Sequence, residues 1–125
     1  MAGKVLIVDD EAYIRLLMEQ TLEDFEDQGI EILTAGNGEE ALKIIQTEAP
    51  NLVFLDVMMP KMNGFEVCQA VKRDLRYKDV FIVLLTAKGQ EFDRLRGEQV
   101  GADVYMTKPF DPDELIEITK KVFAL

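Results

Sequence analysis

The stretch VLIVDDE, residues 5–11, sets the pattern that decides the fold: four apolar residues followed at once by acids. Three later segments also run into a polar group: LVFLD at 52–56 ends at Asp56, VFIVLLT at 80–86 ends at Thr86, and DVYMTK at 103–108 ends at Lys108. The first three runs are almost continuously apolar, which is typical of buried parallel strands. Because the carboxyl ends of parallel strands meet at one edge, where open α/β sheets bind ligands, we expect these polar groups to gather there.

Segments with strand and helix patterns alternate five times along the 125 residues. The predicted strands lie near 4–9, 30–35, 52–56, 80–85 and 103–107. The predicted helices lie near 11–27, 38–48, 64–75, 90–99 and 112–124. Three helix starts carry capping residues, namely Asn37, Asn63 and Asp111, the last followed by Pro112. This (βα)5 alternation predicts one α/β domain over 1–125: a doubly wound, five-stranded parallel sheet with right-handed crossovers and helices on both faces. The chain stops just after the fifth helix, so we expect no second domain within it.

The bulk composition excludes several classes of function. Apolar residues make up 48% and charged residues 30%, as in ordinary globular domains, and the net charge is -10. That charge argues against direct contact with nucleic acid or with an anionic membrane surface, and no apolar run approaches the roughly 20 residues of a membrane span. A single cysteine, Cys68, fits a reducing cytoplasm, so we expect a cytoplasmic location. Since the chain has no histidine, histidine catalysis and ligation are excluded within it.

Three acids at one sheet edge predict a metal site. Asp9, Asp10 and Asp56 would repel one another, and one or more of their pKa values should rise. A bound Mg²⁺ (or Mn²⁺) would relieve this repulsion, since such cations prefer oxygen ligands from one or two carboxylates and from phosphate. One carboxylate could also act as a nucleophile and form an aspartyl phosphate. Lys108 would then supply positive charge, and Thr86 could donate a hydrogen bond to a phosphoryl oxygen.

Each of these residues also has an ordinary structural interpretation. Asp10 could cap the first helix, Thr86 is a common strand residue, and Lys108 could be a solvated surface lysine. Tyr105 could be an ordinary half-exposed aromatic on a strand. The hypothesis of a site depends on their coincidence, because four separate strand ends each carry a group that suits the same chemistry.

Four segments along the chain carry a family resemblance. These segments are VLIVDDE at 5–11, LVFLDVMMPKMNG at 52–64, VLLTA at 83–87 and GADVYMTKPF at 101–110. Together they resemble the CheY-like receiver domain of two-component response regulators, and they extend over the whole chain. The resemblance implies the flavodoxin-like/CheY-like fold with strand order 2-1-3-4-5, an order taken from that family and not from the spacing of these residues.

The resemblance also implies a role for each matching residue. The phospho-acceptor would be Asp56, assisted by Thr86 and Lys108. The ligands of Mg²⁺ would be Asp9, Asp10, Asp56 and the backbone carbonyl of Met58. The switch residues would be Thr86 and Tyr105, and the bond Lys108-Pro109 would be cis.

The implied function is that of a response regulator receiver in a two-component phosphorelay. Asp56 would accept a phosphoryl group from the phosphohistidine of a sensor histidine kinase or a histidine phosphotransfer protein. Phosphorylation would switch the face formed by the fourth helix, fifth strand and fifth helix, which would bind an unknown downstream protein. A phosphorylation-dependent homodimer is left open, but Val104 and Ile118 are apolar where receivers fused to winged-helix transcription factors usually carry an acidic and a basic residue. This argues against that particular salt-bridged dimer.

Two other functions remain in view. The first is a phosphohydrolase of the aspartyl-phosphate class, but those enzymes usually need a cap insertion and a second Asp two residues beyond the nucleophile, where Met58 stands. The second is an interaction module whose acidic site is a relic. For a receiver we expect no conventional enzyme activity, only slow hydrolysis of its own acyl phosphate. These residues do not identify the input signal or the cognate kinase. They fit a stand-alone regulator and a receiver from a longer protein equally.

Overall fold

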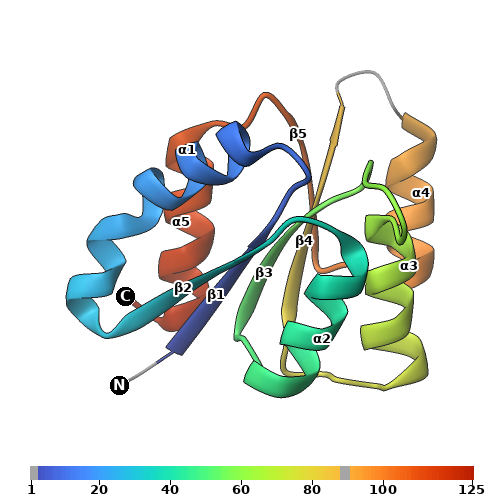
Figure 1. The fold of residues 1–125 in the computed structure, drawn as a ribbon, viewed down its shortest axis with the longest axis horizontal. Coiled ribbons are helices and arrows are strands. Elements are labelled where there is room, and N and C mark those ends of the chain that lie inside the picture. Colours follow the sequence, from blue (N-terminus) through green and yellow to red (C-terminus); the bar gives the residue numbers. More distant parts are fainter. Residues whose placement is uncertain (1–2, 88–90) are drawn as a thin grey trace.

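Five parallel strands form one sheet at the centre of the computed structural model, which describes residues 3–87 and 91–125 (Figure 1). The strands are β1 Gly3–Val8, β2 Ile30–Ala35, β3 Leu52–Asp56, β4 Phe81–Ala87 and β5 Val104–Lys108. Their order in the sheet is β2-β1-β3-β4-β5, as the resemblance implied. The ladder between β4 and β5 continues to the pair Ala87 and Lys108, so β4 runs two residues further than predicted and Thr86 lies inside it.

The helices match the predicted segments, but two of those segments change helix type along their length. The α-helices are α1 Ala12–Leu22, α2 Gly38–Glu48, α3 Gly64–Gln69, α4 Glu91–Val100 and α5 Pro112–Phe123. The segment predicted at 11–27 ends as the 3₁₀ helix η1 (Glu23–Gln28), and the segment predicted at 64–75 ends as the π-helical turn η2 (Ala70–Asp74). The first position of the helix predicted at 90–99 lies outside the described residues. Among those residues, no helix combines the length and the apolar content that crossing a membrane requires.

Capping residues begin three of these helices as the sequence predicted. The Asn37 side chain accepts a hydrogen bond from the Glu40 amide at 2.9 Å. Asn63 and Glu66 bond each other's backbone amides reciprocally, which forms a capping box. Asp111 caps α5. By contrast, α1 begins after Glu11 without a side-chain cap, so the capping role that the sequence allowed for Asp10 is not observed.

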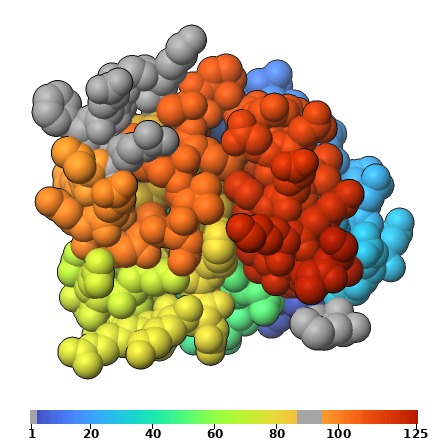
Figure 2. Space-filling model, turned by 180° about the vertical axis from the view of Figure 1, so that it is seen from behind, coloured from blue at the N-terminus to red at the C-terminus, as the bar shows by residue number. Residues whose placement is uncertain are grey.

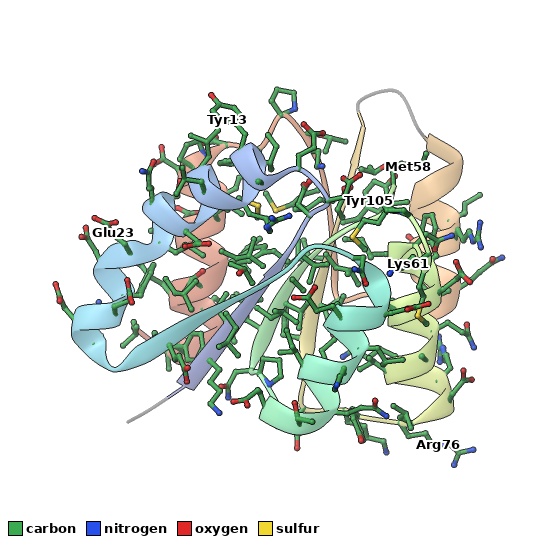
Figure 3. The ribbon with its side chains drawn as sticks, viewed as in Figure 1. Tyr13, Glu23, Met58, Lys61, Arg76 and Tyr105 are labelled. Atoms are coloured by element: carbon green, nitrogen blue, oxygen red, sulfur yellow. The ribbon has the colours of Figure 1, made fainter. Side chains whose placement is uncertain are left out.

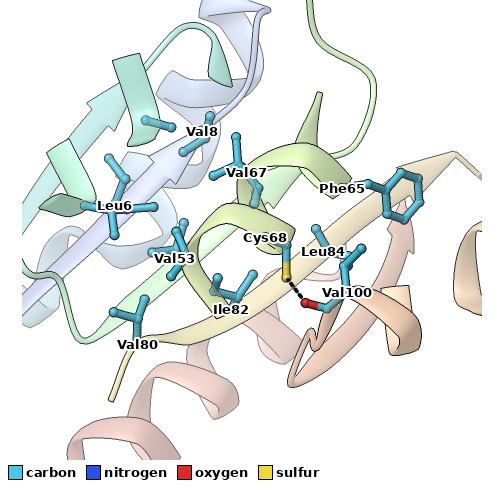
Figure 4. Packing of buried hydrophobic residues seen from close by; sticks show 14 of the residues in the cluster. Leu6, Val8, Val53, Phe65, Val67, Cys68, Val80, Ile82, Leu84 and Val100 are labelled. Atoms are coloured by element: carbon cyan, nitrogen blue, oxygen red, sulfur yellow. Dashed lines mark hydrogen bonds between the residues drawn. The ribbon is translucent and has the colours of Figure 1, made fainter. Parts of the chain in front are cut away.

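Two apolar cores cover the two faces of the sheet. Helices α1 and α5 lie on one face, and α2, α3 and α4 lie on the other (Figure 1). Successive strand residues point to opposite faces, so β3 sends Phe54 into the first core and Leu55 into the second. Figure 4 shows part of the second core, where the buried Cys68 thiol donates to the Val100 carbonyl at 3.5 Å. Cys68 is therefore a residue of the apolar core.

Candidate functional site

The carboxyl edge of the sheet brings three acids together. Asp9 directly follows β1, Asp10 comes next, and Asp56 is the last residue of β3. Asp9 and Asp56 are buried, whereas Asp10 is exposed. One carboxylate oxygen from each lies within 4.8 Å of the others. The sequence predicted this cluster because parallel strands end at the same edge of a sheet. The structure shows in addition that β1 and β3 are neighbours.

Lys108 joins this cluster from β5. Its Nζ lies 2.7 Å from Oδ2 of Asp9 and 3.1 Å from Oδ1 of Asp56. Since β4 separates β3 from β5, the lysine reaches past the end of β4 to make both contacts. Two backbone amides also donate to these carboxylates: Glu11 N–H to Oδ1 of Asp9 at 2.9 Å, and Met58 N–H to Oδ1 of Asp56 at 3.3 Å. The two buried carboxylates therefore share one cation.

One lysine does not fully compensate two buried carboxylates. Burial, together with the negative charge of Asp9, raises the pKa of Asp56 to about 6, against the opposing effect of Lys108 and the Met58 amide. For Lys108, burial disfavours the charged form, but the hydrogen bond to Asp9 and the charges of Asp56 and Asp9 outweigh it, so its pKa is raised. At neutral pH Asp56 is mostly ionised, in surroundings that would be stabilised by a further positive charge.

The donor set fits a divalent cation with a preference for oxygen. Mg²⁺ binds oxygens at 2.0–2.1 Å, so two ligands on opposite sides of it lie about 4.2 Å apart. A spread of up to 4.8 Å among the acidic oxygens is close to this span, and a small inward movement or one water-bridged carboxylate accounts for the difference. Asp9, Asp10 and Asp56 are the residues that would hold the ion. The part assigned to the Met58 carbonyl stays a prediction, although its amide already bonds Asp56.

The two switch residues lie on the neighbouring strands β4 and β5. Thr86 is buried and follows Leu85, the register partner of Asp56, so it lies at the same edge on the neighbouring strand. Tyr105 on β5 is half-buried and belongs to the core under α2, α3 and α4. Its ring lies against α4, since a Cβ built on Gly97 would be 3.3 Å from Tyr105 Cδ2. Figure 3 labels the tyrosine towards the carboxyl edge of the sheet, on the side of α4.

The structure adds one residue that the sequence analysis did not single out. Arg15, one turn into α1, donates from Nη1 to the backbone carbonyl of Asp9 at 2.6 Å. The signal available in the sequence was a basic residue placed six positions after a strand-end acid. The bond between Lys108 and Pro109 is cis, as the resemblance implied.

A family model connects this geometry with known proteins. The model described as the response regulator receiver domain matches residues 5–120. Among curated proteins, the alkaline phosphatase synthesis transcriptional regulatory protein PhoP of Bacillus subtilis is 48% identical over 116 residues, which is 92% of this chain and 46% of that protein. The protein named "Probable transcriptional regulator ycf27" of Porphyra purpurea is 51% identical over 112 residues, 90% of this chain and 44% of that protein. The chain thus spans less than half the length of these curated relatives.

Solved structures agree over nearly the full chain. The chemotaxis protein CheY4 of Vibrio cholerae superposes with a TM-score of 0.83 at 37% sequence identity, over 98% of this chain and 99% of that one. The receiver domain of NtrX from Brucella abortus superposes with a TM-score of 0.81 at 30% identity, over 96% and 98% of the two chains. Both superpositions extend over nearly the whole of this chain.

Proposed function

The chain belongs to the response regulator receiver domain family of two-component systems, and from this premise we propose that Asp56 accepts a phosphoryl group from a phosphohistidine. The observation that carries the proposal is the cluster of Asp9, Asp10 and Asp56 within 4.8 Å, with Lys108 bonded to two of its members. Acids at this spacing repel one another without a cation, and they suit the transfer of an anionic group when a cation is present. The sequence contains no histidine, so the donor histidine lies outside these 125 residues.

In the proposed step an oxygen of the Asp56 carboxylate attacks the phosphorus atom. The bond between phosphorus and the histidine nitrogen breaks, and a bond between phosphorus and the carboxylate oxygen forms. The released nitrogen takes a proton from solvent. When bound by Asp9, Asp10 and Asp56, Mg²⁺ would supply charge neutralisation for the phosphoryl oxygens. Lys108 would exchange part of its contact with Asp56 for contact with the new phosphoryl group, whose charge it offsets.

The proposed response passes through Thr86 and Tyr105 to the surface of α4, β5 and α5. A phosphoryl oxygen accepting a hydrogen bond from Thr86 would favour one position of this side chain, and Tyr105, already packed on Gly97 of α4, would follow. Figure 2 shows this surface, with α4, β5 and α5 side by side. A downstream protein would bind it, and a phosphorylation-dependent homodimer is one form that this contact could take.

The remaining features of the proposal concern partners and location. The donor would be a sensor histidine kinase or a histidine phosphotransfer protein. The only catalysis proposed is hydrolysis of the chain's own acyl phosphate, so the chain is not proposed to be an enzyme in the usual sense. The single cysteine and the acidic composition favour a cytoplasmic location without direct contact with nucleic acid or membrane.

Intact mass spectrometry with acetyl phosphate tests the proposal. Wild-type protein, Asp56→Asn and the control Asp111→Asn, which changes an exposed capping residue, would each be incubated with and without Mg²⁺. We expect one phosphoryl adduct on the wild type and on Asp111→Asn only with Mg²⁺, and none on Asp56→Asn. An adduct on Asp56→Asn would refute the assignment of the acceptor.

The absence of any adduct would need one more measurement. Beryllofluoride, a stable mimic of the phosphoryl group, separates rapid hydrolysis from a silent site. Binding of beryllofluoride with Mg²⁺ would indicate a functional site with a short-lived phosphate. Failure to bind either reagent would support the relic interpretation. Family membership favours the receiver function over the phosphohydrolase interpretation, and Met58 stands at the position where that class carries a second aspartate.

A further inference from the structure

We propose that Arg15 is a positioning residue for the metal site, acting through the peptide that links Asp9 to Asp10. This inference rests on the proposed function, because it concerns the same acidic cluster. Arg15 does not belong to that cluster, and its guanidinium donates to a backbone carbonyl, not to a carboxylate. Its proposed effect is therefore on the geometry of the ligands.

Arg15 reaches the end of β1 from the first turn of α1. Its backbone amide bonds the Glu11 carbonyl at 3.1 Å, which places it one turn into the helix. Helical side chains lean towards the helix N-terminus, so the guanidinium is directed back to the loop that precedes the helix. There Nη1 lies 2.6 Å from the Asp9 carbonyl oxygen. The same nitrogen would be 3.4 Å from a Cβ built on Gly36, the first residue after β2, so the guanidinium spans the ends of two neighbouring strands.

The hydrogen bond from Arg15 adds to three other contacts that hold Asp9 in place. Its amide donates to the Ala35 carbonyl at 3.2 Å, its Oδ1 accepts from Glu11 N–H, and its Oδ2 contacts Lys108. Arg15 occupies the remaining polar group, the carbonyl oxygen. This oxygen lies in the same rigid plane as the amide nitrogen and the Cα of the next residue. Fixing its direction therefore fixes the direction in which the backbone enters Asp10.

Asp10 is the acid that depends most on such a contact. Asp9 and Asp56 are buried and are held by hydrogen bonds and by Lys108, whereas Asp10 is exposed and, among residues 3–87 and 91–125, no hydrogen bond or ion pair holds its carboxylate. The cluster spans 4.8 Å only while the backbone at Asp10 keeps its direction. Loss of the bond from Arg15 would allow the peptide to rotate and would spread the three ligands.

The charge of Arg15 and its proposed positioning role predict opposite changes in Mg²⁺ affinity when Arg15 is replaced. A guanidinium beside a cation site repels the incoming ion, so charge alone predicts that removing it strengthens Mg²⁺ binding. Positioning predicts the opposite, because loss of groups that orient metal ligands typically lowers metal affinity by 10–100-fold. A residue that only stabilised the fold would leave the affinity of the folded protein unchanged.

The experiment is calorimetric titration of MgCl₂ into wild type, Arg15→Met, Arg15→Lys and the control Lys4→Met. Lys4 lies near the start of β1, at the opposite end from the acids, and pairs with Glu48 on the surface. Its replacement therefore removes one positive charge at a position far from the metal site. We expect Arg15→Met to weaken Mg²⁺ binding on the order of tenfold. Arg15→Lys should fall between it and the wild type, since an ammonium keeps the charge but lacks the planar fork. The control should match the wild type.

Circular dichroism would establish that each variant is folded at the titration temperature. If Arg15→Met does not fold, reduced affinity in Arg15→Lys supports the inference, and unchanged or increased affinity overturns it. Equal or tighter binding by folded Arg15→Met would overturn it directly. A wild type that takes up no Mg²⁺ would refute the proposed function together with this inference, whereas wild-type binding that Arg15→Met retains would refute the inference alone.

Discussion

Replacing Asp56 by Asn should stabilise the folded chain at neutral pH when no divalent cation is present. The wild-type carboxylate is buried beside Asp9, and its pKa is raised from an ordinary 3.8 to about 6. Ionisation of this group therefore opposes folding. Asparagine has a similar shape and no charge, and Lys108 keeps its 2.7 Å contact with Asp9 in the variant. The variant thus resembles the protonated form of the site.

The magnitude follows from the difference in proton affinity between folded and unfolded chains. A carboxyl group whose pKa is raised on folding contributes its full stability below the unfolded pKa, and this contribution is lost as pH rises through the folded pKa. With each tenfold change in proton affinity equal to about 1.4 kcal/mol, ionisation of Asp56 lowers the free energy of unfolding by about 2 kcal/mol at pH 5 and about 3 kcal/mol at pH 7. We expect Asp56→Asn to exceed the wild type by these amounts.

Urea unfolding followed by far-UV circular dichroism, with EDTA present, measures this difference between about pH 5 and pH 7.5. Subtracting the wild-type value at each pH removes the contribution of carboxylates that do not interact with position 56. Asp111→Asn serves as the control, because asparagine also caps helices and the site is exposed. If Asp56→Asn were no more stable than the wild type at pH 7, or if the gap did not grow with pH, the ion pair with Lys108 would outweigh burial and the repulsion from Asp9, and the reasoning would be wrong.

Three further outcomes are expected. Gly64→Ala should lose about 2 kcal/mol or more of stability, measured by urea unfolding, because the new Cβ collides with the Asp56 carbonyl oxygen; an unchanged midpoint would contradict the packing of this loop. Asp103→Ala should lose about 1–2 kcal/mol, since its carboxylate accepts from the Ile82 amide at 2.8 Å, and Asp103→Asn, which keeps an acceptor, should lose less. The Cys68 thiol, with a pKa raised by burial to about 12, should react with a disulfide reagent at pH 8 only after unfolding, and rapid labelling of the native chain would show that it is accessible.

Much of the fold followed from short-range features of the sequence. Apolar runs of strand length and helical periodicity gave five strands and five helices, and the caps at Asn37, Asn63 and Asp111 are observed. These signals are local, since backbone conformation and capping depend on residues a few positions apart. The changes of helix type at η1 and η2 were not predicted, because an apolar periodicity does not distinguish an α-helical turn from a 3₁₀ or π turn. The strand order came from the family resemblance and not from the spacing.

The sequence by itself determined which chemical groups stand at the strand ends, and hence that Asp9, Asp10 and Asp56 would meet at one edge. Only the tertiary structure decided which side chains bond to these acids. Lys108 bonds Asp9 across 99 positions of sequence, and Arg15 holds the carbonyl of the same residue from a neighbouring helix. Such contacts depend on strand register, on helix placement and on the direction of each side chain, which arise when distant segments pack together. The raised pKa of Asp56 has the same origin, because burial and neighbouring charge exist only in the folded chain.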